Sequence, residues 1–193
     1  MKIEFILSHY IGRTYQLIMA ISSIIIQTNN NWTLHIICNG PVDDIEFIKN
    51  IFSKFPNIRY SVLDKHYDDF GHTPKNYGLE RALEDWVVMG NDDNYYTPCF
   101  VDEILKSISK NPNLKFIYCD MIHNHYEYNL FKCSPKIGQI DMGNVITLTK
   151  LSQQIPLNID RYEADGIFVE TYISKFCQED NIHHIPRIYF VHN

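Results

Sequence analysis

Two adjacent aspartates, Asp92 and Asp93, are the residues whose type and spacing point most directly to chemistry. They follow an apolar run at residues 86–89, which is typical of a buried strand and ends at Gly90. Burial penalises unpaired carboxylates, and a divalent cation with its preference for oxygen ligands would relieve that cost. The alternative is an Asx-rich turn in which both side chains only accept hydrogen bonds from backbone amides.

The residues after this acidic turn predict a helix that would hold it in place. Thr97 and Pro98 are typical of an N-cap and a first helical position. Apolar residues then recur at helical spacing, at Val101, Ile104, Leu105 and Ile108. A strand, a turn and a helix in this order place the turn at the carboxyl end of a strand, where open α/β sheets bind ligands. A metal ion held there could grip the phosphates of a nucleotide.

Composition narrows the class of protein. The chain has 193 residues, of which 45% are hydrophobic, as expected of a globular chain with a real core. Its net charge of -6 argues against a nucleic-acid or anionic-membrane partner. No apolar run approaches the roughly 20 residues of a membrane span, so no integral membrane segment is expected.

The start of the chain and its cysteines bear on the compartment. Glu4 stands where a signal peptide would have its apolar region. The 5 cysteines are widely spaced and form no C-x-x-C pair, which fits reduced thiols. We therefore expect a cytoplasmic protein.

Strands and helices alternate up to about residue 120, which predicts a mostly parallel sheet covered on both faces. Strands are expected at residues 3–7, 34–38, 58–63, 86–89, 116–119, 145–148 and 185–191, and helices at 14–27, 42–55, from 73, 97–110 and 165–176. Residues 120–140 show no clear period. We expect one domain over residues 1–193, in which residues 1–110 bind a nucleotide and residues 111–193 shape the pocket of a second substrate.

Five segments, in this order, resemble the GT-A fold glycosyltransferases of the family 2 type: residues 3–13, 20–28, 32–41, 75–78 and 91–93. The resemblance covers most of the chain. It implies a three-layer α/β/α fold with a mixed, mostly parallel central sheet. The implied activity is transfer of a sugar from a nucleotide-diphosphate sugar, with UDP as the expected carrier, to a hydroxyl of a glycan or other acceptor, with inversion. A divalent ion, Mn²⁺ or Mg²⁺, would stabilise the charge on the leaving diphosphate.

The sequence departs from the family pattern at three positions. Asn39 stands where an acidic residue is usual, Asn91 occupies the first position of the D-x-D motif, and Lys75 replaces an arginine. The chain is also short for the family.

Position in the resemblance assigns roles to further residues. The nucleotide-binding residues would be Ser8, Tyr10, Arg13, Asn39, Lys75 and Asp92. Asp93 would be the first metal ligand, with His192 closing the metal site. The alternative for His192 is a frayed terminus.

The expected catalytic base is Asp165, and Glu163 is the second candidate. Asp165 would also suit a helix N-cap, and the two roles are compatible. Residues 141–144 would line the donor-sugar or acceptor side, unless they form an ordinary turn. His123 and His125 share one face of a strand, and we expect them to form an acceptor wall rather than a metal pair.

Two other functions remain open. A sugar nucleotidyltransferase shares this sheet topology but would have a glycine-rich, basic phosphate loop, whereas residues 8–13 hold only Gly12 and Arg13. A catalytically degenerate nucleotide-sugar-binding module is favoured by Asn39 and Asn91.

Overall fold

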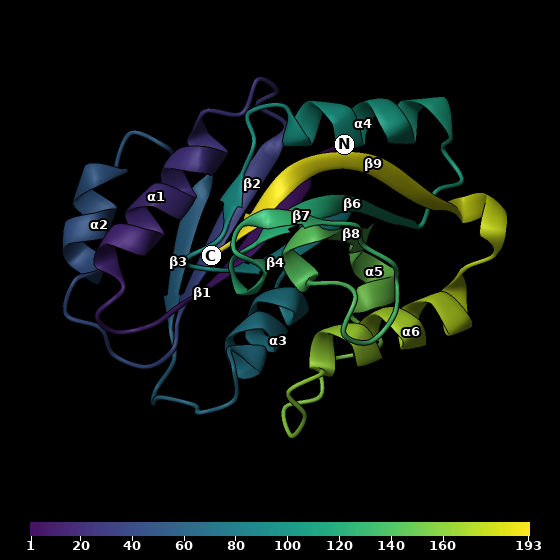
Figure 1. Ribbon diagram of the computed structural model, residues 1–193. Helices are drawn as coiled ribbons and strands as arrows, with labels where there is room; N and C mark the ends of the chain where they lie inside the picture. Colours follow the sequence, from purple (N-terminus) through teal and green to yellow (C-terminus); the bar gives the residue numbers. More distant parts are fainter.

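The computed structural model describes residues 1–193 and contains one sheet of nine strands with helices on both of its faces (Figure 1). The strands are β1 (Ile3–His9), β2 (Trp32–Cys38), β3 (Ile58–Val62), β4 (Trp86–Asn91), β5 (Tyr95–Tyr96), β6 (Phe116–His123), β7 (Asn129–Phe131), β8 (Val145–Leu148) and β9 (Ile182–His192). The α-helices are α1 (Thr14–Ile25), α2 (Ile45–Ile51), α3 (His72–Glu80), α4 (Phe100–Lys110), α5 (Thr149–Ser152) and α6 (Ala164–Phe176). Short 3-10 helices are η1 (Asn124–Tyr126), η2 (Met142–Asn144) and η3 (Glu179–Asn181). None of the helices is long and apolar enough to cross a membrane.

The strand order is β3-β2-β1-β4-β8-β6-β9-β5, with β7 pairing with β6 off this path. The strands from β3 to β4 are all parallel, whereas β8 runs antiparallel to both β4 and β6. Strand β9 returns parallel to β6. The predicted α/β architecture with a mixed sheet between helical layers is therefore confirmed.

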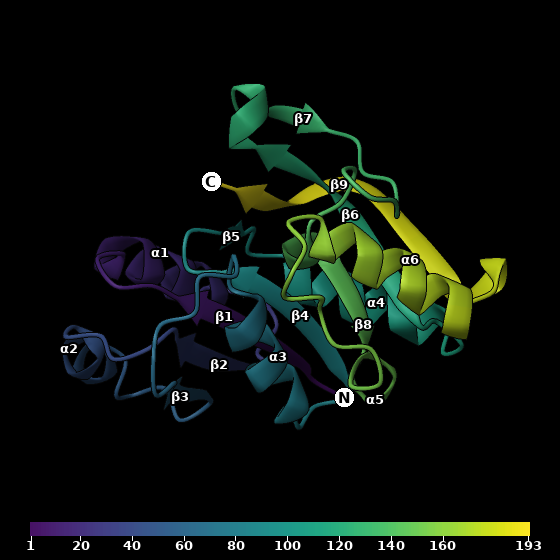
Figure 2. The same cartoon turned by 90° about the horizontal axis from the view of Figure 1, so that it is seen from below.

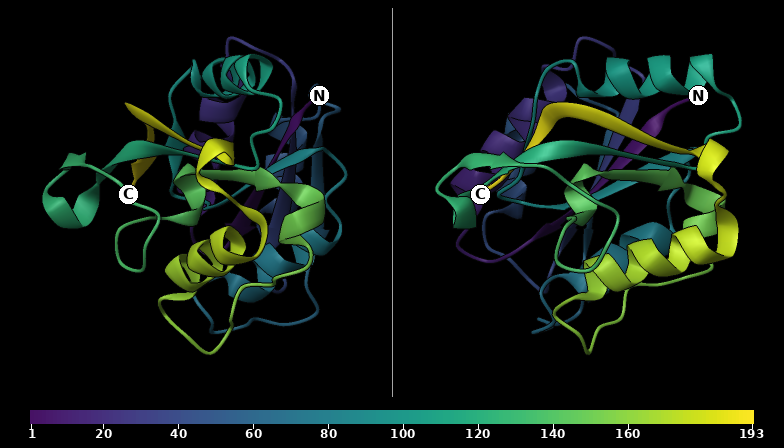
Figure 3. Two further views of the ribbon diagram at one scale, coloured as in Figure 1. Left: turned by 90° about the vertical axis from the view of Figure 1, so that its right-hand side faces the viewer. Right: turned by 45° about the vertical axis from the view of Figure 1, so that its right-hand side comes forward.

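Side-chain alternation along β1 shows how the layers form. Phe5 points to one face, where its ring lies 4.9 Å from the ring of Tyr96 and 5.8 Å from that of Phe100. Ile6 points to the other face, where α3 comes so close that a Cβ on Gly78 would lie 2.5 Å from Ile6 Cγ2. Figure 3 shows α4 and α6 on opposite faces of the sheet. One cluster of buried apolar residues runs through both halves of the chain.

The start of α4 corrects a prediction. Its N-cap is Cys99, so the assignment of Thr97 and Pro98 to the N-cap and first helical position is wrong. Tyr95–Tyr96 forms β5, which pairs with β9, and the Thr97 amide still donates to the Tyr189 carbonyl at 3.0 Å. The chain is therefore extended up to this point and cannot enter the helix earlier.

The segment after residue 120, which has no clear sequence period, forms a hairpin. β6 continues to His123, and η1 then leads into β7. Glu127 and Tyr128 both have positive φ, 52° and 58°, which closes this turn. β9 pairs along the length of β6 and sets His192 opposite His123. The end of the chain thus lies beside the β6–β7 hairpin, as Figure 2 shows.

Candidate active site

The acidic turn and the turn after β1 form one structure at the carboxyl ends of their strands. The sheet register sets Ser8 opposite Asn91, and Ser8 Oγ donates to Asn91 Oδ1 at 2.8 Å. The Asp92 amide donates to the Ser8 carbonyl at 3.0 Å, and Asn94 Oδ1 accepts from the Asn91 amide at 2.8 Å. Two segments far apart in the sequence are therefore fixed to each other before any ligand binds.

Asp92 lies at the centre of this structure, and its side chain is fully buried. Its Oδ2 lies 2.8 Å from His9 Nδ1 and accepts from the Tyr10 amide at 2.9 Å. Its Oδ1 accepts from Arg13 Nη1 at 3.3 Å. Asp92 thus organises the loop after β1 in this state, and its contact with a nucleotide stays a prediction.

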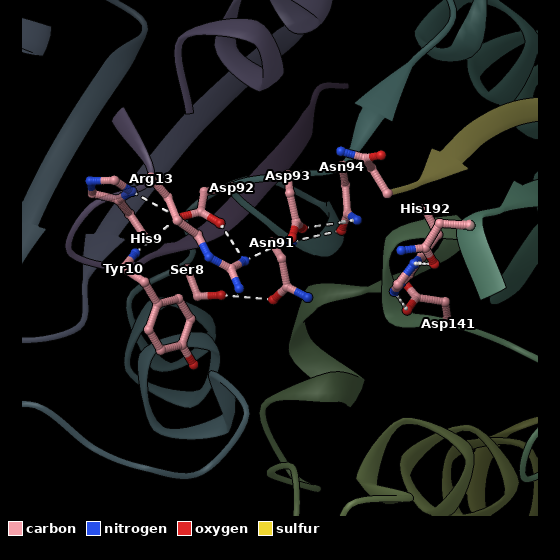
Figure 4. Close-up of polar contacts among 12 residues, drawn as sticks. Ser8, His9, Tyr10, Arg13, Asn91, Asp92, Asp93, Asn94, Asp141 and His192 are labelled. Carbon is pink, nitrogen blue, oxygen red and sulfur yellow. Dashed lines mark hydrogen bonds and ion pairs between the residues drawn. The ribbon is translucent and has the colours of Figure 1, made fainter. Parts of the chain in front are cut away.

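Asp93 is the more accessible of the two carboxylates, with 19% of its side chain exposed. Its Oδ2 accepts from Arg13 Nη1 at 2.7 Å, so one guanidinium nitrogen contacts both aspartates (Figure 4). Burial raises the pKa of Asp93 above its ordinary value, and the charge of Asp92 raises it further. Arg13 and His192 oppose that rise in pKa. Nearby positive charge therefore stabilises the ionised form of Asp93.

Asn39 explains one departure from the family pattern. Its Nδ2 donates to the Tyr67 carbonyl at 2.7 Å, and its Oδ1 accepts from the Tyr67 amide at 2.9 Å. An ionised carboxylate could accept but not donate here, so only an amide satisfies both backbone groups. Asn39 is buried and clamps the loop between β3 and α3 over the end of β2.

Tyr10 lies under the same loop. Its ring packs edge-on against His66 at 5.9 Å, and burial raises the pKa of its hydroxyl to about 12, with Asp69 adding to the rise. Its hydroxyl is therefore a neutral hydrogen-bonding group at neutral pH.

A cleft of about 310 Å³ lies beside the acidic turn, between the two halves of the chain. Four of the predicted site residues line it: Lys75, Glu163, Asp165 and His192. Asn91 also lines the cleft and connects it to the acidic turn. The other predicted residues, namely Ser8, Tyr10, Arg13, Asn39, Asp92 and Asp93, cluster around that turn and do not line the cleft itself.

His192 is held within β9 and is not frayed. Its ring stacks on His123 with centroids 4.1 Å apart and an interplanar angle of 7°. Its Nε2 lies 3.5 Å from Asp141 Oδ2, and its Nδ1 lies 3.3 Å from Asn124 Oδ1. The ring is therefore fixed at the wall of the cleft.

Asp141 is a site residue that the sequence indicated only as part of the segment 141–144. It precedes η2, where its Oδ1 accepts from the Gly143 amide at 2.7 Å. Burial raises the pKa of Asp141, the charge of Asp165 raises it further, and His192 opposes the rise. Asp141 and Asp165 thus lie close enough in the same cleft for their charges to interact. Asp141 lies in a capped turn and also lines the cleft, and its place on the donor-sugar or acceptor side stays a prediction.

Asp165 and Glu163 differ in how they are held. The N-cap of α6 is Glu163, and Asp165 lies in the first helical turn, so Asp165 is not the cap. Asp165 Oδ2 accepts from the Met142 amide at 3.3 Å, whereas its buried Oδ1 has no hydrogen-bond partner. Glu163 has 46% of its side chain exposed and lies 3.6 Å from Arg161. Of the two candidates for the base, Asp165 is therefore the one whose carboxylate is held by the backbone.

Lys75 lines the cleft from α3. The residue is buried, with 3% exposed, yet no hydrogen bond or ion pair forms at its ammonium group. His72, one turn earlier, has its pKa lowered first by burial and then by the charge of Lys75. An ammonium group without an ion-pair partner at the wall of a cleft is suited to an anionic ligand.

Aromatic side chains form the mouth of the cleft, and the sequence alone gave no sign of the pair on its near side. Phe70, with φ 56°, and Tyr162 are 60% and 68% exposed, and their rings meet edge-on at 5.1 Å. Both line the cleft, as do His123 and His125 from the β6–β7 hairpin. Exposed aromatic rings on both sides of an opening suit a ring-shaped ligand.

Comparison with known proteins agrees with this architecture, although no protein-family model matches the sequence. An uncharacterized glycosyltransferase of Haemophilus influenzae is 24% identical over 112 residues, which are 56% of this chain and 36% of that protein. Among solved structures, S. aureus TarS superposes with a TM-score of 0.80 at 14% identity, over 100% of this chain and 37% of TarS. The fold is GT-A-like.

Two further structures show what chains of this fold bind. S. aureus TarS 1–349 in complex with UDP-GlcNAc has a TM-score of 0.77 at 13% identity, over 99% of this chain and 58% of that one. Mannosyltransferase PcManGT of Pyrobaculum calidifontis, in complex with GDP-Man and Mn²⁺, has a TM-score of 0.73 at 11% identity, over 98% of this chain and 56% of that one. The chain therefore spans little more than a third to three fifths of these proteins.

Proposed function

We propose that this chain is a glycosyltransferase that moves a sugar from a nucleotide-diphosphate donor, UDP-linked, to an acceptor hydroxyl with inversion. The observation that carries the proposal is a cleft that places two kinds of group beside the acidic turn. These are the ammonium of Lys75 and the carboxylate of Asp165, and the turn itself holds Asp93.

The nucleotide-diphosphate sugar would extend from the loop after β1 into the cleft. Tyr10 would contact the nucleoside, because its ring and neutral hydroxyl lie beside the end of β1. Lys75 would pair with the diphosphate and oppose the negative charge that develops on it as the sugar leaves. Its present lack of a partner makes it free for that role.

Asp165 would act as general base. When the acceptor hydroxyl attacks the anomeric carbon, its proton passes to the Asp165 carboxylate, the bond to the diphosphate oxygen breaks, and a new glycosidic bond forms on the opposite face of the sugar. The Met142 amide donates to Asp165 Oδ2 at 3.3 Å and so orients the carboxylate. Phe70 and Tyr162 would receive the acceptor at the mouth, with His123 and His125 as the far wall.

The side chains near the acidic turn fit a divalent ion that takes few of its ligands from the protein. No group of three or more His, Cys, Asp or Glu side chains could hold a metal ion on its own. Asp93 and His192 would supply protein ligands, and phosphate oxygens and water would complete the shell, as is usual for Mg²⁺. When bound, Mn²⁺ or Mg²⁺ would neutralise charge on the leaving diphosphate.

A thermal-shift screen tests the proposal. UDP-sugars and GDP-sugars are added with Mn²⁺ or with EDTA, because a ligand that binds the native state raises its melting temperature. We expect the largest shift from a UDP-sugar with Mn²⁺, followed by slow release of free sugar from that donor when no acceptor is present.

The same experiment separates the other functions. A shift with no donor turnover under any condition would indicate a degenerate nucleotide-sugar-binding module. Formation of a sugar nucleotide from a nucleoside triphosphate and a sugar phosphate would indicate a nucleotidyltransferase. Absence of any shift with every nucleotide would contradict the proposal.

A further inference from the structure

Arg13 occupies the position between the two aspartates of the acidic turn. Its Nη1 lies 2.7 Å from Asp93 Oδ2 and 3.3 Å from Asp92 Oδ1 (Figure 4). A single cationic atom that contacts one oxygen of each carboxylate stands where a bound divalent ion would also contact them. Arg13 and a cation at this position would therefore exclude each other, both by volume and by charge.

The charges show why such an exchange is favourable. Two ionised aspartates carry two negative charges, and Arg13 supplies one positive charge. A divalent ion would compensate the negative charge more completely, and the guanidinium would then need a new anionic partner.

Arg13 is also able to leave. It lies in the turn between β1 and α1, and 44% of its side chain is exposed. Besides the aspartates it lies only over the Tyr10 ring, with its Cζ 5.5 Å from the centroid. A guanidinium pairs well with phosphate oxygens because its planar fork matches their geometry.

We propose that Arg13 is an exchangeable counter-ion. It neutralises Asp92 and Asp93 in the nucleotide-free protein, and it transfers to the diphosphate when a divalent ion takes its place. This inference rests on the proposed function. It has a consequence that the proposed function alone does not have: Arg13 weakens metal binding to the nucleotide-free protein, so removal of Arg13 should strengthen that binding.

A purely structural role for Arg13 makes a different prediction. If Arg13 only held the loop after β1 against the acidic turn, its removal would loosen both carboxylates. Affinity for a metal ion would then fall or stay the same. The sign of the change in metal affinity therefore separates the two roles.

The test measures binding of Mn²⁺ alone, without nucleotide, from the signal of free Mn²⁺ in electron paramagnetic resonance. We expect Arg13→Gln to bind Mn²⁺ at least roughly fivefold more tightly than the wild type, at the low end of the range typical of coupled sites. Arg13→Lys keeps the charge and should bind Mn²⁺ about as weakly as the wild type. Arg161→Gln is the matched control, because Arg161 is an exposed arginine that lies near a carboxylate, Glu163, at the cleft.

A second measurement uses UDP at saturating Mn²⁺, where Arg13→Gln should bind UDP more weakly than the wild type because the guanidinium no longer contacts the diphosphate. The inference is overturned if Arg13→Gln binds Mn²⁺ no more tightly than the wild type, if no variant binds Mn²⁺, or if Arg161→Gln gains as much. Those outcomes leave the proposed function standing wherever a UDP-sugar is still bound and turned over. If Arg13→Gln does not fold, Arg13→Met, which also lacks the charge, takes its place in the same Mn²⁺ titration with the same expected result.

Discussion

The two halves of the candidate site, the acidic turn with the loop after β1 and the wall of the cleft opposite it, are built in different ways. In the first half, neighbouring parallel strands bring Ser8 and Asn91 side by side, and each lies next to the loop that it serves. In the second half, Asp141, Asp165 and His192 come from a turn before β8, the first turn of α6 and the end of β9. The first half places its polar groups by strand order alone. The second half places them by packing between elements that are far apart in the sequence, so it should respond differently to mutation.

The largest expected effect comes from the second half. Asp165→Asn keeps the size of the side chain but cannot take a proton at neutral pH. Transfer should fall by roughly 10²–10⁴-fold, as is typical when a general base is lost, while the melting temperature and donor affinity stay near wild-type values. Glu163→Gln should have a much smaller effect, since Glu163 is half-exposed and lies near Arg161. A loss in Glu163→Gln with none in Asp165→Asn would move the base to Glu163.

A pair of glycine substitutions compares the stability of the two halves. A Cβ on Gly143 would lie 2.3 Å from the Phe190 ring, and one on Gly78 would lie 2.5 Å from Ile6 Cγ2. Overpacking of this kind costs about 1–3 kcal/mol. Gly143→Ala should lower the free energy of unfolding more, because Phe190 is a rigid, fully buried ring. Gly78→Ala meets flexible side-chain ends and gains about 0.5–1 kcal/mol of helix propensity.

Urea denaturation of the two variants checks this order. Because the Gly143 amide holds the side chain of Asp141, which lines the cleft, Gly143→Ala should also lower transfer activity at temperatures where it is fully folded. Equal activity of both variants under those conditions would show that the wall formed by Asp141 does not contribute to the site.

The smallest effect is expected at the mouth of the cleft. Phe70→Ala and Tyr162→Ala should each raise the KM for the acceptor roughly two- to tenfold, since an aromatic contact is worth about 0.5–1.5 kcal/mol beyond its buried area. Donor hydrolysis without acceptor should not change. Tyr15→Ala, which removes an 83% exposed tyrosine on α1, is the control. Equal KM values for the acceptor in all three variants would show that Phe70 and Tyr162 do not contact the acceptor.

The sequence predicts the first half of the molecule well because its signals are local. Hydrophobic runs and helical periods predicted each strand and helix up to residue 119 except β5, although their ends differ by a few residues. β5 has two residues and exists only because β9 pairs with it, so it leaves no pattern of its own. The same absence of a local signal caused the error at Thr97 and Pro98.

Site residues could be predicted from the sequence where a short segment around them carries a recognisable pattern. Lys75, Asp165 and His192 were selected from the sequence, and the structure brings all three to one cleft. The pairing of His192 with Asp141 was not predictable, since it depends on the register of β9 against β6 and on the irregularities near Asp120. The role of Asn39 as a clamp on Tyr67 likewise depends on a loop fold that the sequence does not encode locally.

The central claim is that both halves hold one donor through one metal ion, with Asp93 from the first half and His192 from the second. A double-mutant cycle tests it most directly. The affinity for UDP with Mn²⁺ is measured by titration calorimetry for the wild type, Asp93→Asn, His192→Gln and the double variant, and again with EDTA. We expect each single variant to lose affinity, the double variant to lose no more than the worse single one, and a coupling of roughly 0.5–3 kcal/mol that vanishes in EDTA. Losses that add, or that persist unchanged in EDTA, would contradict a shared metal ion.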